Sequence, residues 1–173
     1  MIKFFVSSMA ALLLHPAQAE SRYFSGPDVA LELAIQNDSR DEVSRAIASG
    51  ANPNARGQQD ITPLMIAVDR KKQNAVAELL DRGANPNAKA KDGNSPISLA
   101  IENYAKNPNI SLILILAGGD PNTRRPDNDP VIMRFVNDRN CDFIRQWKAL
   151  GADLDVVTRA GDPIVTNLSR EIL

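Results

Sequence analysis

Apolar residues between positions 62 and 83 fall at helical spacing. In the first half of this segment they are Leu64, Ala67 and Val68, and in the second half Val76, Leu79 and Leu80. Positions three and four apart share one face of a helix, so the segment predicts two short helices, each with an apolar stripe. One such pair cannot bury both stripes by itself. The pattern therefore predicts that neighbouring helix pairs bury them for one another.

Two short motifs recur along the chain in step with each other. The first begins with glycine and forms the segments Gly50–Asn54, Gly83–Asn87, Gly118–Asn122 and Gly151–Asp155, spaced 33, 35 and 33 residues apart. The second places proline after a polar residue at Thr62–Pro63, Ser95–Pro96, Asp129–Pro130 and Asp162–Pro163, spaced 33, 34 and 33 residues apart. A fixed period of this length indicates a repeat architecture.

Each motif has a reason in the backbone of a helix. The side-chain oxygen of Thr, Ser or Asp accepts a hydrogen bond from a free amide of the first turn, and proline suits the next position. All four of these pairs are therefore expected to begin helices. The glycines are expected just after helix ends, where a left-handed residue is favoured. Each unit is then two antiparallel helices followed by a projecting turn rich in Asn, Asp and Gly.

This pattern resembles the ankyrin repeat, which begins a helix with Thr-Pro-Leu-His-x-Ala and later continues with Gly-Ala-Asp-Val-Asn. The clearest copy runs from Thr62–Ala67 to Gly83, and a second begins at Ser95–Ala100. The resemblance covers roughly Pro27 to Leu173. It implies an all-α solenoid of about four helix-turn-helix repeats and a C-terminal half repeat, expected at about residues 28–60, 61–93, 94–127, 128–160 and 161–173.

The chain also departs from the ankyrin pattern. Met65, Ser98 and Ile132 stand where the family has histidine. The first repeat has no Thr-Pro pair, so we expect Asp28 or a neighbour to cap its first helix. Two extra residues in the third repeat are placed in the segment 105–108, between its helices. The apolar segment 110–116 would favour a strand in isolation, but its position in the repeat predicts a helix, which we expect to be the most enclosed one.

The first twenty residues have the pattern of a secretory signal peptide. Lys3 precedes an apolar run of about eleven residues, and Ala17-Gln18-Ala19 is a small-x-small cleavage site before Glu20. The run is shorter than the roughly 17 to 25 residues that a membrane anchor needs. We therefore predict a signal peptide at 1–19 and a mature domain at 20–173 that is periplasmic or secreted and does not insert into the membrane.

Composition excludes several classes of function. The whole chain has 20 basic and 21 acidic residues, and loss of residues 1–19 removes Lys3 and the single histidine, His15. The mature charge of about −2 and the 5% aromatic content disfavour nucleic acid as a partner. A mature chain without histidine has no Ser-His-Asp or Cys-His catalysis and no histidine-bound metal. We expect no cofactor and no enzymatic activity, and an enzyme that uses paired carboxylates is the alternative.

The resemblance implies a protein-binding module, because an open repeat stack offers a surface to extended partners. We predict a monomer that binds another exported protein and stabilises or regulates it. An immunity protein that neutralises a secreted antibacterial toxin is the alternative. The contact positions of the family map onto the turns and the ends of the first helices. These positions are Gln58, Gln59, Ile61, Asp69, Arg70, Asn94, Glu102, Asn103, Asn128, Val136 and Asn137.

Basic residues also recur in the projecting turns and could form a positive row for an acidic partner. They are Arg56, Lys89, Lys91, Arg124, Arg125 and Arg159. The interpretation we favour is that they serve solubility and turn geometry, with nearby aspartates neutralising them. Trp147 is expected in the core rather than at an interface. Cys141 has no partner for an internal disulfide and is expected to be half-buried on a helix, with intermolecular pairing or a redox role as alternatives.

Overall fold

The computed structural model describes residues 23–102, 104–105 and 107–164 of the chain. The predicted signal peptide and most of the C-terminal half repeat lie outside these residues. The described part is built from α-helices and one short 3-10 helix. In chain order these are α1 (Asp28–Asn37), α2 (Arg40–Ala48), η1 (Gln58–Asp60), α3 (Pro63–Asp69), α4 (Gln73–Asp81), α5 (Pro96–Glu102), α6 (Asn109–Leu116), α7 (Met133–Asn137) and α8 (Cys141–Ala149).

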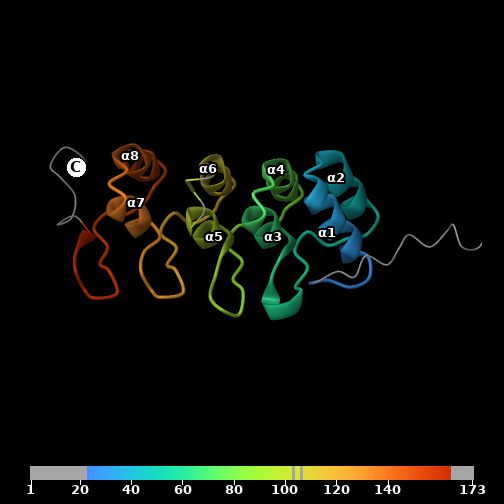
Figure 1. Ribbon diagram of the computed structural model, residues 1–173, viewed down its shortest axis with the longest axis horizontal. Helices are drawn as coiled ribbons and strands as arrows, with labels where there is room; N and C mark the ends of the chain where they lie inside the picture. The colour runs from blue at the N-terminus through green and yellow to red at the C-terminus, as the bar shows by residue number, and fades with distance from the viewer. Residues whose placement is uncertain (1–22, 103, 106, 165–173) are drawn as a thin grey trace, which may run out of the picture.

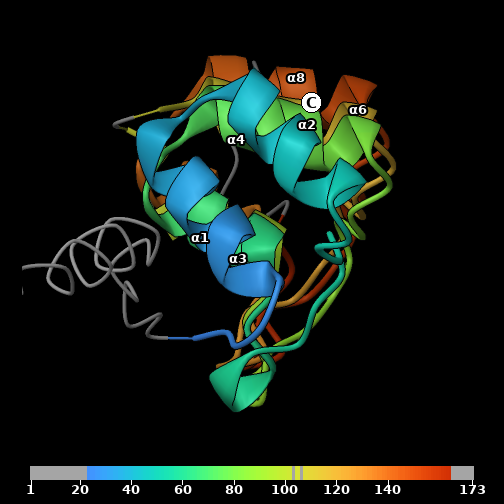
Figure 2. The ribbon, with the colours of Figure 1, turned by 90° about the vertical axis from the view of Figure 1, so that its right-hand side faces the viewer.

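The helices form four antiparallel pairs that stand side by side along the molecule (Figure 1). The view along the stack shows two layers, with α1 and α3 in an inner layer and α2, α4, α6 and α8 in an outer layer (Figure 2). Long turns project from the inner-layer side. The predicted all-helical solenoid is therefore confirmed, and within the described residues pairing between extended segments is limited to two isolated bridges.

One continuous apolar core runs through the stack between the two layers. Its fully buried side chains come from every helix pair and include Leu31, Ile35, Leu64, Leu79, Ile97, Ile101, Leu114, Phe135 and Trp147. Trp147 is completely buried, as expected, and its ring lies 5.2 Å from that of Phe135. Each pair covers the apolar stripe of its neighbour, which is the stabilisation that a repeat stack requires.

The start and stop signals of the middle repeats behave as their sequence predicts. Thr62 Oγ1 accepts from the Met65 amide at 3.3 Å, and Ser95 Oγ accepts from the Ser98 amide at 3.2 Å. Gly50 and Gly83 come one residue after the C-caps Ser49 and Arg82 of α2 and α4, at the second position beyond each helix, and have φ of 104° and 81°. A side chain with a β-carbon would be strained at such angles, so glycine ends these helices at little cost.

Two predicted caps are wrong because distant amides take their side chains. The carboxylate of Asp28 accepts from the Asn52 amide at 2.7 Å, and α1 begins after Pro27 without a side-chain cap. The carboxylate of Asp129 accepts from the Arg159 amide at 2.7 Å, and α7 begins only at Met133. Pro130 pairs with the preceding turn instead of opening a helix.

Three further expectations are settled in this part of the chain. The connection between α5 and α6 spans residues 103–108, whereas residues 70–72 join α3 to α4, so the insertion lies between the helices as predicted. The expectation that the segment 110–116 is the most enclosed helix is wrong. Leu116 is 74% exposed because α6 lies in the outer layer, whereas every residue from Pro63 to Val68 in α3 is buried. Cys141 is half-buried at the first position of α8.

Candidate functional site

The projecting turns share one backbone shape because a side-chain oxygen closes each of them. Asn52 Oδ1 accepts from the Asn54 amide at 2.9 Å, and Asn85 Oδ1 accepts from the Asn87 amide at 2.9 Å. Asp120 and Asp153 make the same contact in the later turns. This local Asx turn is the reason that Asn and Asp recur here. The turns are thereby held at fixed positions along one side of the stack.

Two arginines of the predicted positive row brace one turn against the next. Arg56 Nη1 donates to the carbonyl oxygens of Lys89 at 2.7 Å and of Asp60 at 3.2 Å. Arg124 donates to the carbonyl oxygens of Asn128 at 2.6 Å and Val157 at 3.3 Å. The guanidinium groups of these two residues therefore hold the geometry of the turns.

The other four basic residues of the predicted row differ in their contacts. Arg125 pairs with Asp127 at 3.1 Å and with Asp129 at 3.4 Å, whereas Lys89, Lys91 and Arg159 are exposed. The structure therefore does not assemble a continuous row of unengaged cations on the turns.

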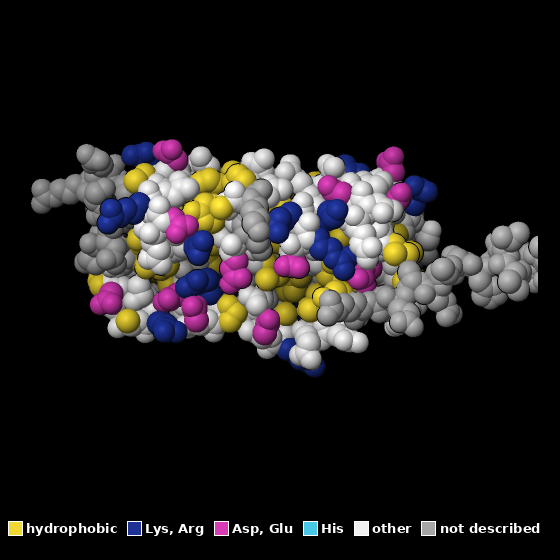
Figure 3. Space-filling model, viewed as in Figure 1, with side chains coloured by type: hydrophobic (Ala, Val, Ile, Leu, Met, Phe, Trp, Pro, Cys, Tyr) yellow, Lys and Arg dark blue, Asp and Glu magenta, His cyan; other side chains and the backbone are white. Residues whose placement is uncertain are grey.

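A hollow of about 130 Å³ lies where α3, α5 and two projecting turns meet. We call it the α3–α5 hollow. Its floor is apolar and is formed by Tyr23, Ile61, Met65, Ile66, Ala90 and Leu99. Figure 3 shows apolar side chains gathered between the helices and the turns, with acidic side chains close by on both sides.

The rim of the α3–α5 hollow is polar and carries more negative than positive charge. It is formed by Asp69, Arg70, Asp92 and Asn94. Both oxygens of the Asp92 carboxylate accept from Asn94, one from its backbone amide at 2.9 Å and the other from its side-chain amide at 2.8 Å. The side-chain oxygen Oδ1 of Asn94 in turn accepts from the Ser98 hydroxyl at 3.2 Å. These contacts fix the direction of the Asp92 carboxylate.

The one cation of the rim is already paired. Arg70 Nη2 lies 3.2 Å from Oε1 of Glu32, whose side chain is 4% exposed. Burying a carboxylate is costly unless a cation partners it, so Arg70 is needed where it is. The guanidinium therefore compensates Glu32 and leaves Asp69 and Asp92 to set the charge of the hollow.

The structure brings together four of the residues predicted as contacts, namely Ile61, Asp69, Arg70 and Asn94. Gln58 and Gln59 are exposed on η1 at the tip of a turn, and Glu102 and Asn137 are exposed at the ends of α5 and α7. Asn128 is exposed in the turn before α7. Asn103 lies outside the described residues.

Val136 does not offer a contact surface. It is 6% exposed and packs in the core. The sequence predicted a helix that begins at Pro130, whereas α7 begins at Met133. Val136 therefore turns inward. The mapping also missed Tyr23 and Asp92, because the former precedes the first repeat and the latter lies on the turn of the following one.

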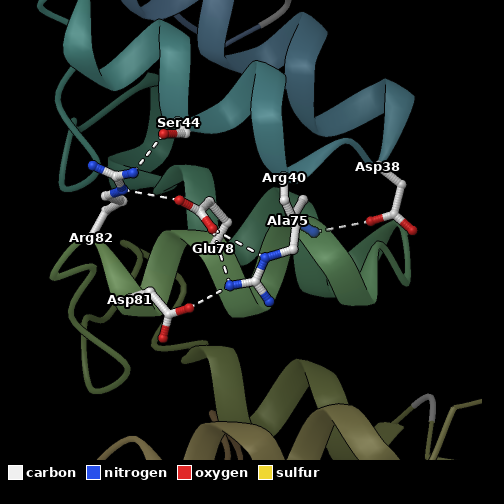
Figure 4. Close-up of polar contacts among 7 residues, drawn as sticks. All are labelled: Asp38, Arg40, Ser44, Ala75, Glu78, Asp81 and Arg82. Atoms are coloured by element: carbon white, nitrogen blue, oxygen red, sulfur yellow. Dashed lines mark hydrogen bonds and ion pairs between the residues drawn. The ribbon is translucent and has the colours of Figure 1, made fainter.

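A second polar cluster lies in the outer layer between α2 and α4 (Figure 4). Glu78 is buried and accepts from Arg40 at 3.1 Å and from Arg82 at 2.9 Å. Arg40 also reaches Asp81, and Arg82 donates to Ser44, both at 2.5 Å. The hydrogen bonds raise the pKa of Arg40 above its ordinary value, chiefly through Asp81. This cluster satisfies its own charges and links two repeats.

The third and fourth repeats are joined by a further polar contact near the ends of their inner helices. The Tyr104 hydroxyl donates to Asp138 Oδ2 at 2.6 Å, and Asp138 is also 3.2 Å from Arg134. The hydrogen bond to a carboxylate, together with burial, raises the pKa of Tyr104 above 10. The tyrosine ring packs on Phe135 with ring centroids 4.9 Å apart.

Within the described residues, no group of three or more His, Cys, Asp or Glu is placed to hold a metal ion. No helix in the same residues has the length and apolar character needed to cross a bilayer. The α3–α5 hollow itself offers an apolar floor and a charged rim.

Comparison with known protein families indicates the same repeat architecture. A family model described as ankyrin repeats, in three copies, matches residues 31–125, which is more than half of the 173 residues. The chain belongs to the ankyrin-repeat family. Ankyrin repeats are protein–protein interaction modules and are generally not enzymes. The matched residues contain all of the α3–α5 hollow except Tyr23. The comparison with curated proteins found no match.

Proposed function

We propose that this ankyrin-repeat chain is exported to the periplasm, loses residues 1–19, and there binds another exported protein through the α3–α5 hollow. The observation that carries the proposal is the hollow itself. It combines an apolar floor with a fixed polar rim, whereas the outer polar cluster around Glu78 uses its charges internally. Recognition sites of this kind gain affinity when their polar groups are already held in place.

The role proposed for the complex is stabilisation or regulation of the partner. The open stack leaves the chain's inner side accessible along its length, which suits an extended segment of another protein. The leader pattern around Ala17 and Ala19 supports export of the chain. Neutralisation of a secreted toxin would use the same surface and is kept as the alternative outcome of the test.

Site-specific photo-crosslinking in living cells tests this proposal. A photoreactive amino acid replaces Ala90, which is half-buried in the hollow, and in a second chain it replaces Ala77, which is half-buried on α4 in the outer layer. We expect one dominant adduct from position 90, recovered in the envelope fraction, and none from position 77. Adducts from position 77 alone, or equal background from both, would contradict the proposed surface. An adduct with a toxin whose activity the chain abolishes would establish the alternative.

A further inference from the structure

We propose that the α3–α5 hollow receives a lysine or arginine side chain from an extended segment of the partner protein. This inference rests on the proposed function and specifies the chemistry of the partner. It follows from the charge around the hollow and from the shape of its floor. Lysine and arginine combine an apolar stem with a charged end and can bury the former while the latter remains hydrated.

The charge balance at the rim favours a cation. Asp69 is exposed at the end of α3, and its carboxylate makes no hydrogen bond or ion pair with any other described residue. Asp92 is exposed and held in one direction by Asn94. Against these two carboxylates stands Arg70, whose charge is offset by the buried Glu32 at 3.2 Å. An incoming cation would therefore meet two uncompensated negative charges, and an incoming carboxylate would be repelled by them.

The floor favours a side chain with an unbranched stem. Ile61, Met65 and Leu99 line it with aliphatic and thioether groups, and Met65 can adjust its shape because its side chain is unbranched. The methylene groups of lysine or arginine would cover this apolar surface. The charged end would then lie at the rim, within reach of the two aspartates.

The inner side continues the same charge beyond the hollow. Glu102 ends α5 at the position that Asp69 holds in α3, 33 residues earlier, and it too is exposed. A partner segment that runs along the stack would meet a second acidic residue one repeat further on. We therefore expect a segment with more than one basic residue to bind more tightly than a segment with one.

The test measures binding of short peptides by NMR, using the full chain with labelled Ile, Leu and Met methyl groups. The peptides are acetylated and share one sequence of uncharged residues except at the central position. That position is lysine, norleucine or glutamate. Norleucine has the apolar stem of lysine without the charge. We expect the methyl signals of Ile61, Met65 and Leu99 to shift. The lysine peptide should bind about fivefold more tightly than the norleucine peptide, as two exposed ion pairs provide.

Matched variants separate charge from folding. The double variant Asp69→Asn, Asp92→Asn should bind the lysine and norleucine peptides equally, while Asp142→Asn, on the exposed outer side of α8, should keep the preference. Thermal unfolding checks that both variants fold. Equal binding of the lysine and norleucine peptides to the unmodified chain, tighter binding of the glutamate peptide, no methyl shift, or a preference that survives in the double variant would overturn the inference. A crosslink at position 90 would still support the proposed function in each of these cases.

Discussion

Asn54 holds the boundary between two repeats by contacting the turn of Asn85 from both sides. Its Oδ1 accepts from the Asn85 amide at 2.7 Å, and its Nδ2 donates to the Gly83 carbonyl at 2.8 Å. Asn87 and Asn122 make the same two contacts with the turns that follow them. Asp28 supplies the first contact of this series. The recurrent asparagine thus sets the spacing of the turns that border the hollow.

We predict that Asn54→Ala lowers the free energy of unfolding by about 1 kcal/mol, because two hydrogen bonds across the boundary are lost and water replaces them in the exposed turn. Asn54→Asp should lose less, because the acceptor for the Asn85 amide remains. Urea unfolding followed by circular dichroism measures the difference. Asn74→Ala, on the exposed side of α4, is the control and should cause no loss. Equal stability of Asn54→Ala and the unmodified chain would contradict the role of this contact.

The outer cluster gives a second stability prediction. Glu78 is 7% exposed and bonds to both Arg40 and Arg82. Because the arginines are partly exposed, water can hydrate them after Glu78→Gln, and we expect a loss of about 1 to 2 kcal/mol rather than a larger one. Chemical unfolding of this variant should be compared with Asp142→Asn, whose exposed pair with Arg145 should contribute close to nothing. Similar losses in the two variants would refute a special role for Glu78.

Local signals in the sequence predicted the helix ends well. They failed where a side chain bonds to another repeat instead of to its own helix. Thr62, Ser95 and Gly83 act on backbone groups within a few residues, so their residue type decides their role. Asp28 and Asp129 have the same capping chemistry, but their oxygens bond to amides 24 and 30 residues away. The sequence alone does not show which of two possible donors wins.

In the candidate site, too, local sequence signals predicted some residues, and contacts between repeats decided the others. Ile61, Asp69 and Asn94, which were chosen by their phase in the repeat, lie together at one surface. Asp92 joins them only because the turn of one repeat stands beside the inner helix of the previous one. The apolar segment of α6 predicted burial from hydrophobicity alone, whereas the exposure of Leu116 depends on the layer in which the helix lies.

Substitutions of Arg56 and of Lys89 should differ in their effects on stability. Arg56→Ser removes hydrogen bonds to the carbonyls of Lys89 and Asp60, so we expect a loss of about 1 kcal/mol in the free energy of unfolding. Lys89→Ser keeps the carbonyl that Arg56 contacts, and it should change stability by less than about 0.5 kcal/mol. Differential scanning calorimetry of the two variants decides this. A larger loss for Lys89→Ser would show that bracing is not the role of Arg56.

Export of the chain predicts that residues 1–19 are removed. Mass spectrometry of the protein recovered from the envelope fraction should give the mass of a chain that begins at Glu20, since the small residues Ala17 and Ala19 fit the cleavage enzyme. Replacing both alanines with phenylalanine should leave the uncleaved precursor. Recovery of the intact chain beginning at Met1, in the cytoplasm and with either sequence, would refute export.

The contact between Tyr104 and Asp138 predicts a loss of stability at alkaline pH. The raised pKa of Tyr104, caused first by its hydrogen bond to Asp138, means that the folded chain holds this proton more tightly than the unfolded chain. The contribution is fully present below about pH 10, the ordinary value for tyrosine, and is lost as the pH rises through the folded pKa. Urea unfolding at neutral pH and above pH 10 should show this loss in the unmodified chain. Tyr104→Phe should remove that part of the pH dependence at a cost of about 1 kcal/mol at neutral pH. Asp138→Asn should weaken the pH dependence while keeping a hydrogen-bond acceptor, and an unchanged alkaline loss in both variants would show that the effect arises elsewhere.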